Sequence, residues 1–281
     1  MDRLEAHRRF YADLVTTSAG VAKNERLKDA LASTPRERFV GAGPWKVFAG
    51  GNYIETPTDD PAFLYQDVVV AIAPERRINN GQPLLHALSL AALNVQPGEK
   101  VLHVGAGTGY YSAVLARLTG ATGTVVAYEV EHDLAQHAVR NLSDLSSVTV
   151  QERSGAEAPL PVCDAIYVNA GATAPLDVWL DALQLQGRLL VPLTSADGPG
   201  GAPGLGGVLL VVRAAPECFD ARFLCNAMFV PCLGARDEET AQKLSAAFKR
   251  GDFRNVKSLR RNSEADDTCW CAGNGWWLST A

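Results

Sequence analysis

The fold is decided by one stretch of sequence, Val101-Leu102-His103-Val104-Gly105-Ala106-Gly107-Thr108-Gly109. An apolar run here passes into three alternate glycines, which predicts a buried strand, a tight turn and then a helix. Such a turn lets the backbone approach a ligand closely, and the following helix directs free N–H groups at that ligand. About twenty residues later a second apolar run ends in Tyr128-Glu129, where a carboxylate can accept hydrogen bonds from both ribose hydroxyls. Together these features predict a nucleotide-cofactor site.

The spacing of the glycines separates two classes of cofactor. A dinucleotide fingerprint, G-x-G-x-x-G, would need a third glycine where the chain has Tyr110. The third glycine comes one residue earlier, at Gly109. This spacing favours S-adenosylmethionine, whose methionyl part needs close backbone approach and which has no pyrophosphate to bind. The alternative is that the glycines only form a turn and that Glu129 is a solvated strand end.

Composition sets the outer bounds. The chain has 281 residues, of which 47% are hydrophobic and 20% charged, with a net charge of -5, as in a globular protein of one large domain or two small ones. No apolar run reaches the roughly 18 residues of a membrane span, and the first nine residues are too charged for a signal peptide. The six cysteines lack C-x-x-C spacing, so we expect a reduced, cytoplasmic chain without a metal site. Neither nucleic acid nor a membrane is expected as a partner, and the oligomeric state stays open.

Helix and strand patterns alternate after the glycine turn, which predicts a parallel sheet covered on both faces. The predicted helices lie at residues 111–118, 134–142 and 176–185, and the strands at 124–128, 148–150, 164–169 and 187–192. Residues 195–207 are rich in Gly and Pro and predict a loop. Runs at 208–213 and 223–230 have no helix between them and predict an antiparallel edge. A further helix is expected around residues 241–248, and Cys269, Trp270, Cys271, Trp276 and Trp277 are expected to pack.

Several segments resemble the protein-L-isoaspartate O-methyltransferase family, across roughly residues 20 to 235. The matching segments are Pro35-Arg36-Glu37-Arg38-Phe39-Val40, Gly81-Gln82-Pro83-Leu84-Leu85-His86-Ala87, Asp164-Ala165-Ile166-Tyr167-Val168-Asn169-Ala170-Gly171-Ala172, Gly187-Arg188-Leu189-Leu190-Val191-Pro192 and Val230-Pro231. The resemblance implies a Rossmann-like class I methyltransferase fold of the α/β class, with a mostly parallel, doubly wound sheet, an antiparallel edge, and N- and C-terminal additions. It also implies S-adenosylmethionine as cofactor and an isoaspartyl carboxylate in a peptide or protein as acceptor.

We predict that the chain has three parts. Residues 1–80 are an N-terminal helical segment with a substrate-side loop, residues 81–234 are the cofactor-binding core, and residues 235–281 are a C-terminal extension. The predicted cofactor-binding residues are His103, Gly105, Ala106, Gly107, Thr108, Gly109, Tyr110, Glu129, Val130, Ser154, Gly155 and Asn169. The predicted acceptor-side residues are Asn80, Gly81, Gln82 and His86.

The acceptor side differs from the family pattern. Family members typically carry a serine or threonine hydroxyl at the position that holds Gly81, so this donor is missing and Gly81→Ser is expected to raise isoaspartyl activity. The amides of Asn79, Asn80 and Gln82 and the N–H of Gly81 are the donors that remain. The alternative is a polar loop whose amides satisfy its own backbone. His86 falls four residues after Gln82 on a predicted helix, where it either orients a substrate or is satisfied by a neighbour.

The expected reaction needs no general base. An ionised carboxylate, with an ordinary pKa near 4, attacks an activated sulfonium methyl when it is held in line with it. The loop at Ser154-Gly155 lacks the aspartate that the family usually offers to adenine. Two other functions stay open: methyl transfer to a specialised peptide or small molecule, and a cofactor-binding protein that docks a partner through Trp270, Trp276 and Trp277. Asn169-Ala170-Gly171-Ala172 lacks the Pro-Pro-aromatic pattern of nucleic-acid amino-methyltransferases.

Overall fold

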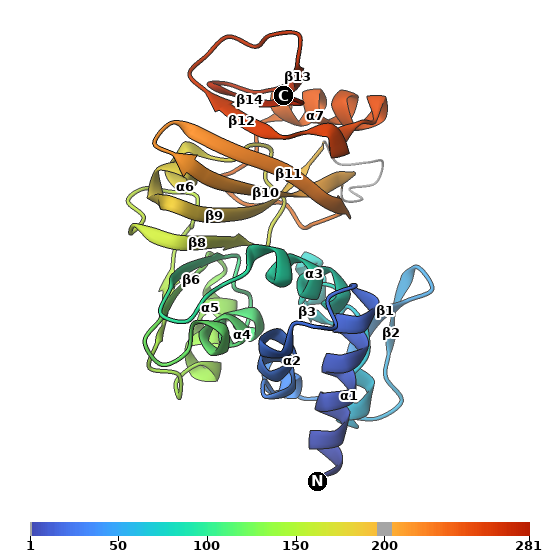
Figure 1. Ribbon diagram of the computed structural model, residues 1–281. Coiled ribbons are helices and arrows are strands. Elements are labelled where there is room, and N and C mark those ends of the chain that lie inside the picture. Colours follow the sequence, from blue (N-terminus) through green and yellow to red (C-terminus); the bar gives the residue numbers. More distant parts are fainter. Residues whose placement is uncertain (1, 196–203) are drawn as a thin grey trace. The chain divides into compact units, whose positions relative to one another are not determined.

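The computed structural model describes residues 2–195 and 204–281 (Figure 1). The chain divides into two compact units, one of Met1–Glu99 with Ala106–Arg153 and one of Lys100–Gly105 with Ser154–Ala281. Most of the predicted loop at 195–207 lies outside the described residues, because residues 196–203 are not described. The predicted boundaries after residues 80 and 234 stay predictions.

The first unit is built mainly from helices. Its α-helices are α1 (Arg3–Ser18), α2 (Glu25–Ala32), α3 (Pro83–Leu93), α4 (Tyr110–Thr119) and α5 (His132–Asn141). Its short 3-10 helices are η1 (Arg36–Phe39), η2 (Pro61–Leu64) and η3 (Pro74–Arg76). Helices α1 and α2 lie side by side, and α2 also packs on α4 (Figure 1).

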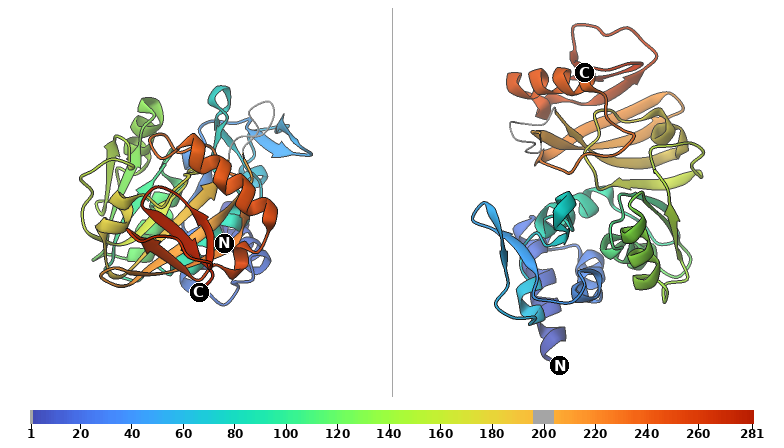
Figure 2. Two further views of the ribbon diagram at one scale, coloured as in Figure 1. Left: turned by 90° about the horizontal axis from the view of Figure 1, so that it is seen from above. Right: turned by 180° about the vertical axis from the view of Figure 1, so that it is seen from behind.

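Strands of the first unit fall into three pairs. The antiparallel pairs are β1 (Lys46–Ala49) with β2 (Asn52–Glu55) and β3 (Ala71–Ala73) with β4 (Ile78–Asn79), and the parallel pair is β6 (Thr124–Glu129) with β7 (Val148–Glu152). The hairpin of β1 and β2 extends away from helices α1 and α2 of this unit (Figure 2). Helix α4 buries Tyr111, Val114, Leu115 and Leu118, the residues whose helical spacing predicted it, and it ends at Gly120.

The second unit contains one sheet with the strand order β13-β14-β12-β11-β10-β9-β8-β5. Strand β5 (Lys100–Val104) pairs in parallel with β8 (Cys163–Val168), which pairs in parallel with β9 (Leu183–Thr194). Strands β10 (Gly206–Ala215) and β11 (Cys218–Ala227) continue the sheet as an antiparallel hairpin. The parallel strands with intervening helices confirm the Rossmann-like α/β fold that the sequence predicted, together with its antiparallel edge.

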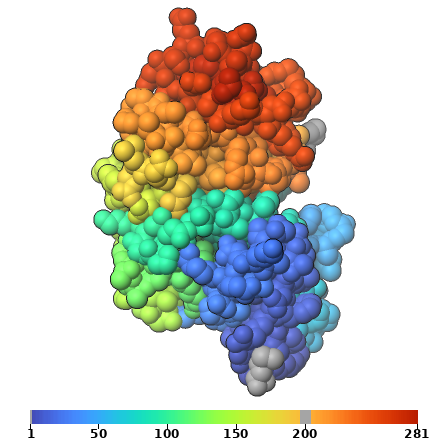
Figure 3. Space-filling view, viewed as in Figure 1, coloured from blue at the N-terminus to red at the C-terminus, as the bar shows by residue number. Residues whose placement is uncertain are grey.

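The antiparallel part is longer than the predicted edge. Residues after 235 form helix α7 (Glu238–Arg250), the short helix η5 (Phe253–Asn255) and strands β12 (Ser258–Arg261), β13 (Cys269–Ala272) and β14 (Trp276–Ser279). These three strands join the sheet beyond β11, and the surface of this segment, red in Figure 3, continues that of β10 and β11, in orange. Trp270, Trp276 and Trp277 are only 4–6% exposed. Packing is therefore confirmed for these side chains, and the idea that they dock a partner is wrong.

Several predicted elements have different bounds, and α6 and β11 show why. Helix α6 (Asp177–Ala182) ends before the predicted residue 185, because Leu183 already pairs with Cys163 as the first residue of β9. Strand β11 begins earlier than the predicted residue 223 and ends before residue 230. Its pairing with β10 begins at Cys218, since the hairpin turn after Ala215 sets the register of both strands.

Candidate functional site

The glycine turn and the acid at the end of β6 meet within the first unit. The Glu129 carboxylate is 6% exposed and accepts three backbone hydrogen bonds, from Gly107 at 2.6 Å, Val130 at 2.9 Å and Glu131 at 3.0 Å. Burial raises the pKa of the Glu129 carboxyl above its ordinary value, and the three N–H groups oppose that shift. Glu129 is therefore not a solvated strand end. Each carboxylate oxygen has further lone pairs with which it can accept from ribose hydroxyls.

Two glycines of the turn are required for different reasons. Gly107 has a φ of +56°, which an L side chain adopts only with strain, and its N–H is the donor to Glu129. Gly109 has a φ of +97°, and a Cβ there would lie 2.7 Å from a methyl carbon of Leu142. The collision at Gly109 is with the protein's own core. Packing against Leu142 therefore explains the glycine at position 109, and room for a ligand does not.

The other predicted residues of the turn mostly face the protein. The Thr108 hydroxyl donates to the carbonyl of Phe39 at 2.5 Å, and the Thr108 carbonyl accepts from Asn141 at 2.9 Å. The Tyr110 ring is 3% exposed and packs edge-on against Phe39. The side chains of Thr108 and Tyr110 are thus committed to contacts within the protein. Val130 differs, since its side chain is 45% exposed directly after Glu129.

In the second unit, the end of β5 carries a polar pair. Asn169 follows β8, and its side-chain nitrogen Nδ2 lies 2.8 Å from Nε2 of His103. The backbone N–H of Asn169 donates to the carbonyl of Val104, also at 2.8 Å. His103 is fully buried, and burial lowers its pKa to about 3, so the ring is neutral and Nε2 accepts from the amide. The Oδ1 atom of Asn169 is buried and has no hydrogen-bond partner among the described residues. It is an acceptor that a ligand can use.

The loop of Ser154 and Gly155 is held by its own unit. The Ser154 hydroxyl accepts from the N–H of Ala156 at 3.1 Å, and the Gly155 carbonyl accepts from the indole of Trp179 at 2.7 Å. Trp179 is fully buried. The loop therefore has a defined shape, and neither Ser154 nor Gly155 carries a carboxylate for an adenine amino group.

The polar groups of the predicted acceptor residues are satisfied largely by other groups of the protein. The Gly81 N–H donates to Oδ1 of Asn79 at 2.9 Å, so the prediction that Gly81 leaves its N–H available is wrong. Gln82 donates to Asp67 at 2.8 Å. The Oδ1 atom of Asn80 accepts from the Val70 N–H, and the backbone N–H of Asn80 donates to the Val70 carbonyl, both at 2.9 Å. Its Nδ2 atom is buried without a partner among the described residues, and is the donor that remains.

Gly81 and His86 occupy neighbouring volumes. Gly81 has a φ of +72°, and a Cβ on it would lie 2.0 Å from Nε2 of His86. A serine at this position would therefore displace the imidazole, which argues against the expectation that Gly81→Ser alone raises activity; that expectation stays a prediction. His86 lies in the first turn of α3, is 3% exposed, and stacks on Tyr111 of α4 at a ring-centre distance of 3.8 Å.

Asp67 contacts this segment, and the sequence did not single it out as functional. Its two carboxylate oxygens accept from Gln82 and from the N–H of Leu84, each at 2.8 Å, and so hold the start of α3. Asp67 lies fifteen residues before Gln82 in a region without periodic pattern. No spacing signal could have connected the two.

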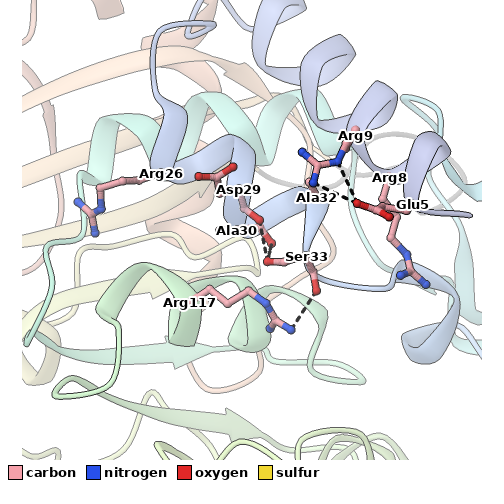
Figure 4. Close-up of a pocket in the computed structure, with 9 residues that line it drawn as sticks. All are labelled: Glu5, Arg8, Arg9, Arg26, Asp29, Ala30, Ala32, Ser33 and Arg117. Atoms are coloured by element: carbon pink, nitrogen blue, oxygen red, sulfur yellow. Dashed lines mark hydrogen bonds and ion pairs between the residues drawn. The ribbon is translucent and has the colours of Figure 1, made fainter. Parts of the chain in front are cut away.

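A hollow of about 540 Å³ lies elsewhere in the first unit, between α1, α2 and α4 (Figure 4). Four arginines line it, but their head groups already have partners in the protein. Arg9 pairs with Glu5, Arg26 donates to the carbonyl of Leu118, and Arg117 donates to the carbonyl of Ser33. The bonds of Arg26 and Arg117 at this hollow thus connect α2 with α4.

Across residues 2–195 and 204–281, no three or more His, Cys, Asp or Glu side chains form a group that could hold a metal ion. Within the same ranges, every helix is too short or too polar to cross a membrane.

Comparison with known proteins identifies the family. The family model for protein-L-isoaspartate(D-aspartate) O-methyltransferase matches residues 13–199. Among curated proteins, the protein-L-isoaspartate O-methyltransferase of Brucella anthropi is 31% identical over 216 residues, which cover 74% of this chain and 86% of the relative. The protein of the same name from a Roseiflexus species is 32% identical over 222 residues, which cover 75% and 86%.

Solved structures agree on the fold. A structure described as a protein-L-isoaspartate O-methyltransferase superposes with a TM-score of 0.65 at 22% identity, covering 86% of this chain and 68% of that one. A second, described as a beta-aspartate methyltransferase from Plasmodium falciparum in complex with S-adenosyl-L-homocysteine, has a TM-score of 0.61 at 17% identity and covers 81% and 98%. The chain therefore belongs to the protein-L-isoaspartate(D-aspartate) O-methyltransferase family, a family of S-adenosylmethionine-dependent methyltransferases.

Proposed function

We propose that this chain transfers the methyl group of S-adenosylmethionine to the side-chain carboxylate of an isoaspartyl residue in a peptide or protein. Family membership supports the reaction class, since the matching model and curated relatives carry this name. The observation that carries the proposal is the buried Glu129 carboxylate, which the backbone of the glycine turn holds directly through Gly107. A carboxylate fixed in this way is suited to a ligand with adjacent hydroxyl groups.

The residues present fit this cofactor. Gly107 has a backbone conformation that a Cβ would strain, and Glu129 has acceptor capacity beyond its three backbone bonds. We assign ribose binding to Glu129, the methionyl part to the turn and the adenine border to the Ser154 loop. The proposed cofactor-binding set is His103, Gly105, Ala106, Gly107, Thr108, Gly109, Tyr110, Glu129, Val130, Ser154, Gly155 and Asn169.

The protein's task on the acceptor side is to position a carboxylate. When bound, the cofactor supplies a methyl group on positively charged sulfur, and an acceptor oxygen displaces that sulfur to form a methyl ester. No proton has to move, because the acceptor is ionised at neutral pH. The buried Nδ2 donor of Asn80 can hold the acceptor by a hydrogen bond to an ionised group, which is stronger than a bond between neutral groups.

A second candidate function is methyl transfer to a specialised peptide or a small molecule. The specific observation in its favour is the acceptor segment, where Asn79 and Asp67 already accept the N–H of Gly81 and the amide of Gln82. Fewer donors then remain for an isoaspartyl main chain. We also propose a cytoplasmic location, since free thiols at all six cysteines suit a reducing compartment.

The decisive experiment compares two peptides that differ only in one linkage. The full chain is incubated with cofactor labelled in its methyl group and with matched aspartyl and isoaspartyl peptides. Label should enter the isoaspartyl peptide alone and be released by mild base, as expected for a methyl ester. Equal labelling of both peptides, or base-stable label, would reject the isoaspartyl assignment. Labelling of neither peptide by a chain that binds S-adenosylhomocysteine would favour the specialised acceptor.

A further inference from the structure

The hairpin of β3 and β4 packs against the glycine turn. A Cβ built on Gly107 would lie 3.1 Å from the Cδ1 atom of Ile72, the middle residue of β3. Gly107 is also the residue whose N–H donates to the Glu129 carboxylate. The hairpin therefore lies on the backbone that holds the proposed ribose acceptor.

A second contact connects the hairpin to the residues after Glu129. Arg76 ends η3, between β3 and β4, and its Nη1 atom donates to Oε2 of Glu131 at 2.6 Å. Asp133, in the first turn of α5, accepts from both terminal nitrogens of Arg76, at 2.8 and 2.6 Å. A two-point contact between arginine and a carboxylate fixes the orientation of both groups. The Arg76 side chain is 32% exposed, so water reaches this network only in part.

Glu131 joins this network to the cofactor carboxylate. Its side chain accepts from Arg76, while its backbone N–H donates to Oε1 of Glu129 at 3.0 Å. The position of Arg76 therefore affects one of the three donors that hold Glu129. At the other end of the hairpin, Asn80 follows β4 and bonds to Val70 through its side chain and its backbone. One hairpin thus contacts the support of the cofactor carboxylate and carries the proposed donor to the acceptor.

We propose that Arg76 is a positioning residue that couples cofactor binding to acceptor binding. This inference rests on the proposed function, in which Glu129 binds the ribose and Asn80 holds the acceptor carboxylate. A cofactor bound at the turn restricts the hairpin through Ile72 and Glu131, so that the acceptor loses less conformational entropy when it binds. By linkage, the acceptor raises the affinity for the cofactor by the same factor. Arg76 acts through its carboxylate partners and takes no part in the chemistry.

Calorimetry on the full chain measures the coupling. The isoaspartyl peptide should bind about fivefold more tightly with saturating S-adenosylhomocysteine than without it. In Arg76→Ala this coupling factor should fall to about one, because the hairpin no longer responds to the cofactor end. At saturating cofactor, KM for the peptide should then rise about fivefold while kcat changes less. Arg76→Lys, which keeps the charge but loses the two-point contact, should lie between Arg76→Ala and the wild type.

A matched control is a second two-point arginine pair of the same unit. Arg38 donates to both carboxylate oxygens of Asp144, at 2.9 and 2.7 Å, and neither residue belongs to the hairpin. Arg38→Ala should leave the coupling factor unchanged. The double variant Glu131→Ala, Asp133→Ala releases Arg76 from the other side and should lower the factor as Arg76→Ala does. It gives the same test in a chain that keeps the arginine, and melting temperatures show that each variant is folded.

The outcomes separate this inference from the proposed function. If the wild type labels the isoaspartyl peptide but Arg76→Ala keeps the full coupling factor, the inference alone is wrong. An equal loss of coupling in Arg38→Ala, or a wild type whose peptide affinity does not respond to S-adenosylhomocysteine, would also overturn the inference alone. A wild type that neither binds nor labels the peptide would overturn it together with the proposed function.

Discussion

Two neighbouring parts of the first unit hold their polar groups in opposite ways. At the glycine turn, the backbone N–H groups of Gly107, Val130 and Glu131 surround a side-chain carboxylate, that of Glu129. At the acceptor segment, side chains surround the backbone, since Asn79 holds the N–H of Gly81 and Asp67 holds that of Leu84.

The difference predicts where the protein tolerates change. Backbone donors cannot be exchanged by mutation, so the proposed cofactor end depends on one backbone conformation and one buried carboxylate. Side-chain partners can be exchanged singly, so the acceptor end can change its donors while the chain path stays the same. We expect substitutions at the turn to affect stability and cofactor affinity, and single exchanges of the polar groups at residues 79–82 to change acceptor kinetics while cofactor affinity stays the same.

The largest expected effect is on stability at Gly109. Gly109→Ala should lower the free energy of unfolding by about 3 kcal/mol, because a φ of +97° is strained for alanine and its Cβ would lie 2.7 Å from Leu142. Chemical denaturation measures this. The matched control is Gly120→Ala at the other end of α4, where φ is +68° and no atom lies within 4 Å, so that only the strain of about 1 kcal/mol remains. Equal losses at both sites would show that packing does not specify the turn.

A second prediction concerns His103, at the end of the strand that leads into the turn. Burial lowers its pKa to about 3 in the folded state, against 6.5 ordinarily. The unfolded chain therefore binds a proton below pH 6.5 that the folded chain does not, so this contribution to stability is present above pH 6.5 and is lost on acidification. Between pH 7 and pH 5 the loss should be about 2 kcal/mol.

The measurement is the free energy of unfolding at pH 7 and pH 5, for the wild type and for His103→Gln. The difference between the two proteins gives the contribution of His103. The variant should lose about 2 kcal/mol less than the wild type on acidification. His137→Gln serves as the control because His137 is exposed. An identical pH dependence in wild type and His103→Gln would mean that His103 is protonated in the folded protein.

The third prediction tests the buried charge itself. Glu129→Ala should raise the dissociation constant of S-adenosylhomocysteine at least tenfold, about 1.4 kcal/mol, because it removes the proposed ribose acceptor. Calorimetry measures the change. Glu152→Ala is the control, since Glu152 ends the adjacent strand β7 beside Glu129 but is exposed. Unchanged affinity in Glu129→Ala would remove Glu129 from the cofactor site.

The same carboxylate predicts a pH dependence of binding. Since burial raises the pKa of Glu129 above 4.5, protonation should remove an acceptor and weaken binding at pH values where an ordinary glutamate is still ionised. Affinity should be constant near neutral pH and fall on acidification. Glu129→Gln, which cannot titrate, should lack that fall.

The smallest expected effect lies at the acceptor end. Asn80→Asp preserves the acceptor for the Val70 N–H but replaces the buried Nδ2 donor by a carboxylate oxygen. We expect about a fivefold loss of kcat/KM for the isoaspartyl peptide, about 1 kcal/mol, with unchanged affinity for S-adenosylhomocysteine. Steady-state kinetics measures the first and calorimetry the second. A loss of cofactor affinity in this variant would show that the acceptor segment also contributes to cofactor binding, contrary to the proposal.

Local pattern was enough for most of the fold, for the glycine turn and for the acid at the end of β6. The helical spacing from Tyr111 to Leu118 and the β-branched run before Glu129 predicted α4 and β6, because both patterns depend on neighbours a few residues apart. Local pattern did not predict where α6 ends, and it did not predict that three strands after residue 257 join the sheet. Pairing across a sheet depends on residues far apart in sequence.

The sequence by itself determined the glycine turn, the acid at the end of β6 and hence the class of cofactor, because backbone conformation and residue spacing are local properties. Only the tertiary structure decided what Gly81 and Gly109 are for. Gly81 faces the His86 ring on α3, and Gly109 faces Leu142 after α5. The spacing of residues along the chain predicts neither contact. Steric fit between separate elements is a property of packing, which local pattern does not encode.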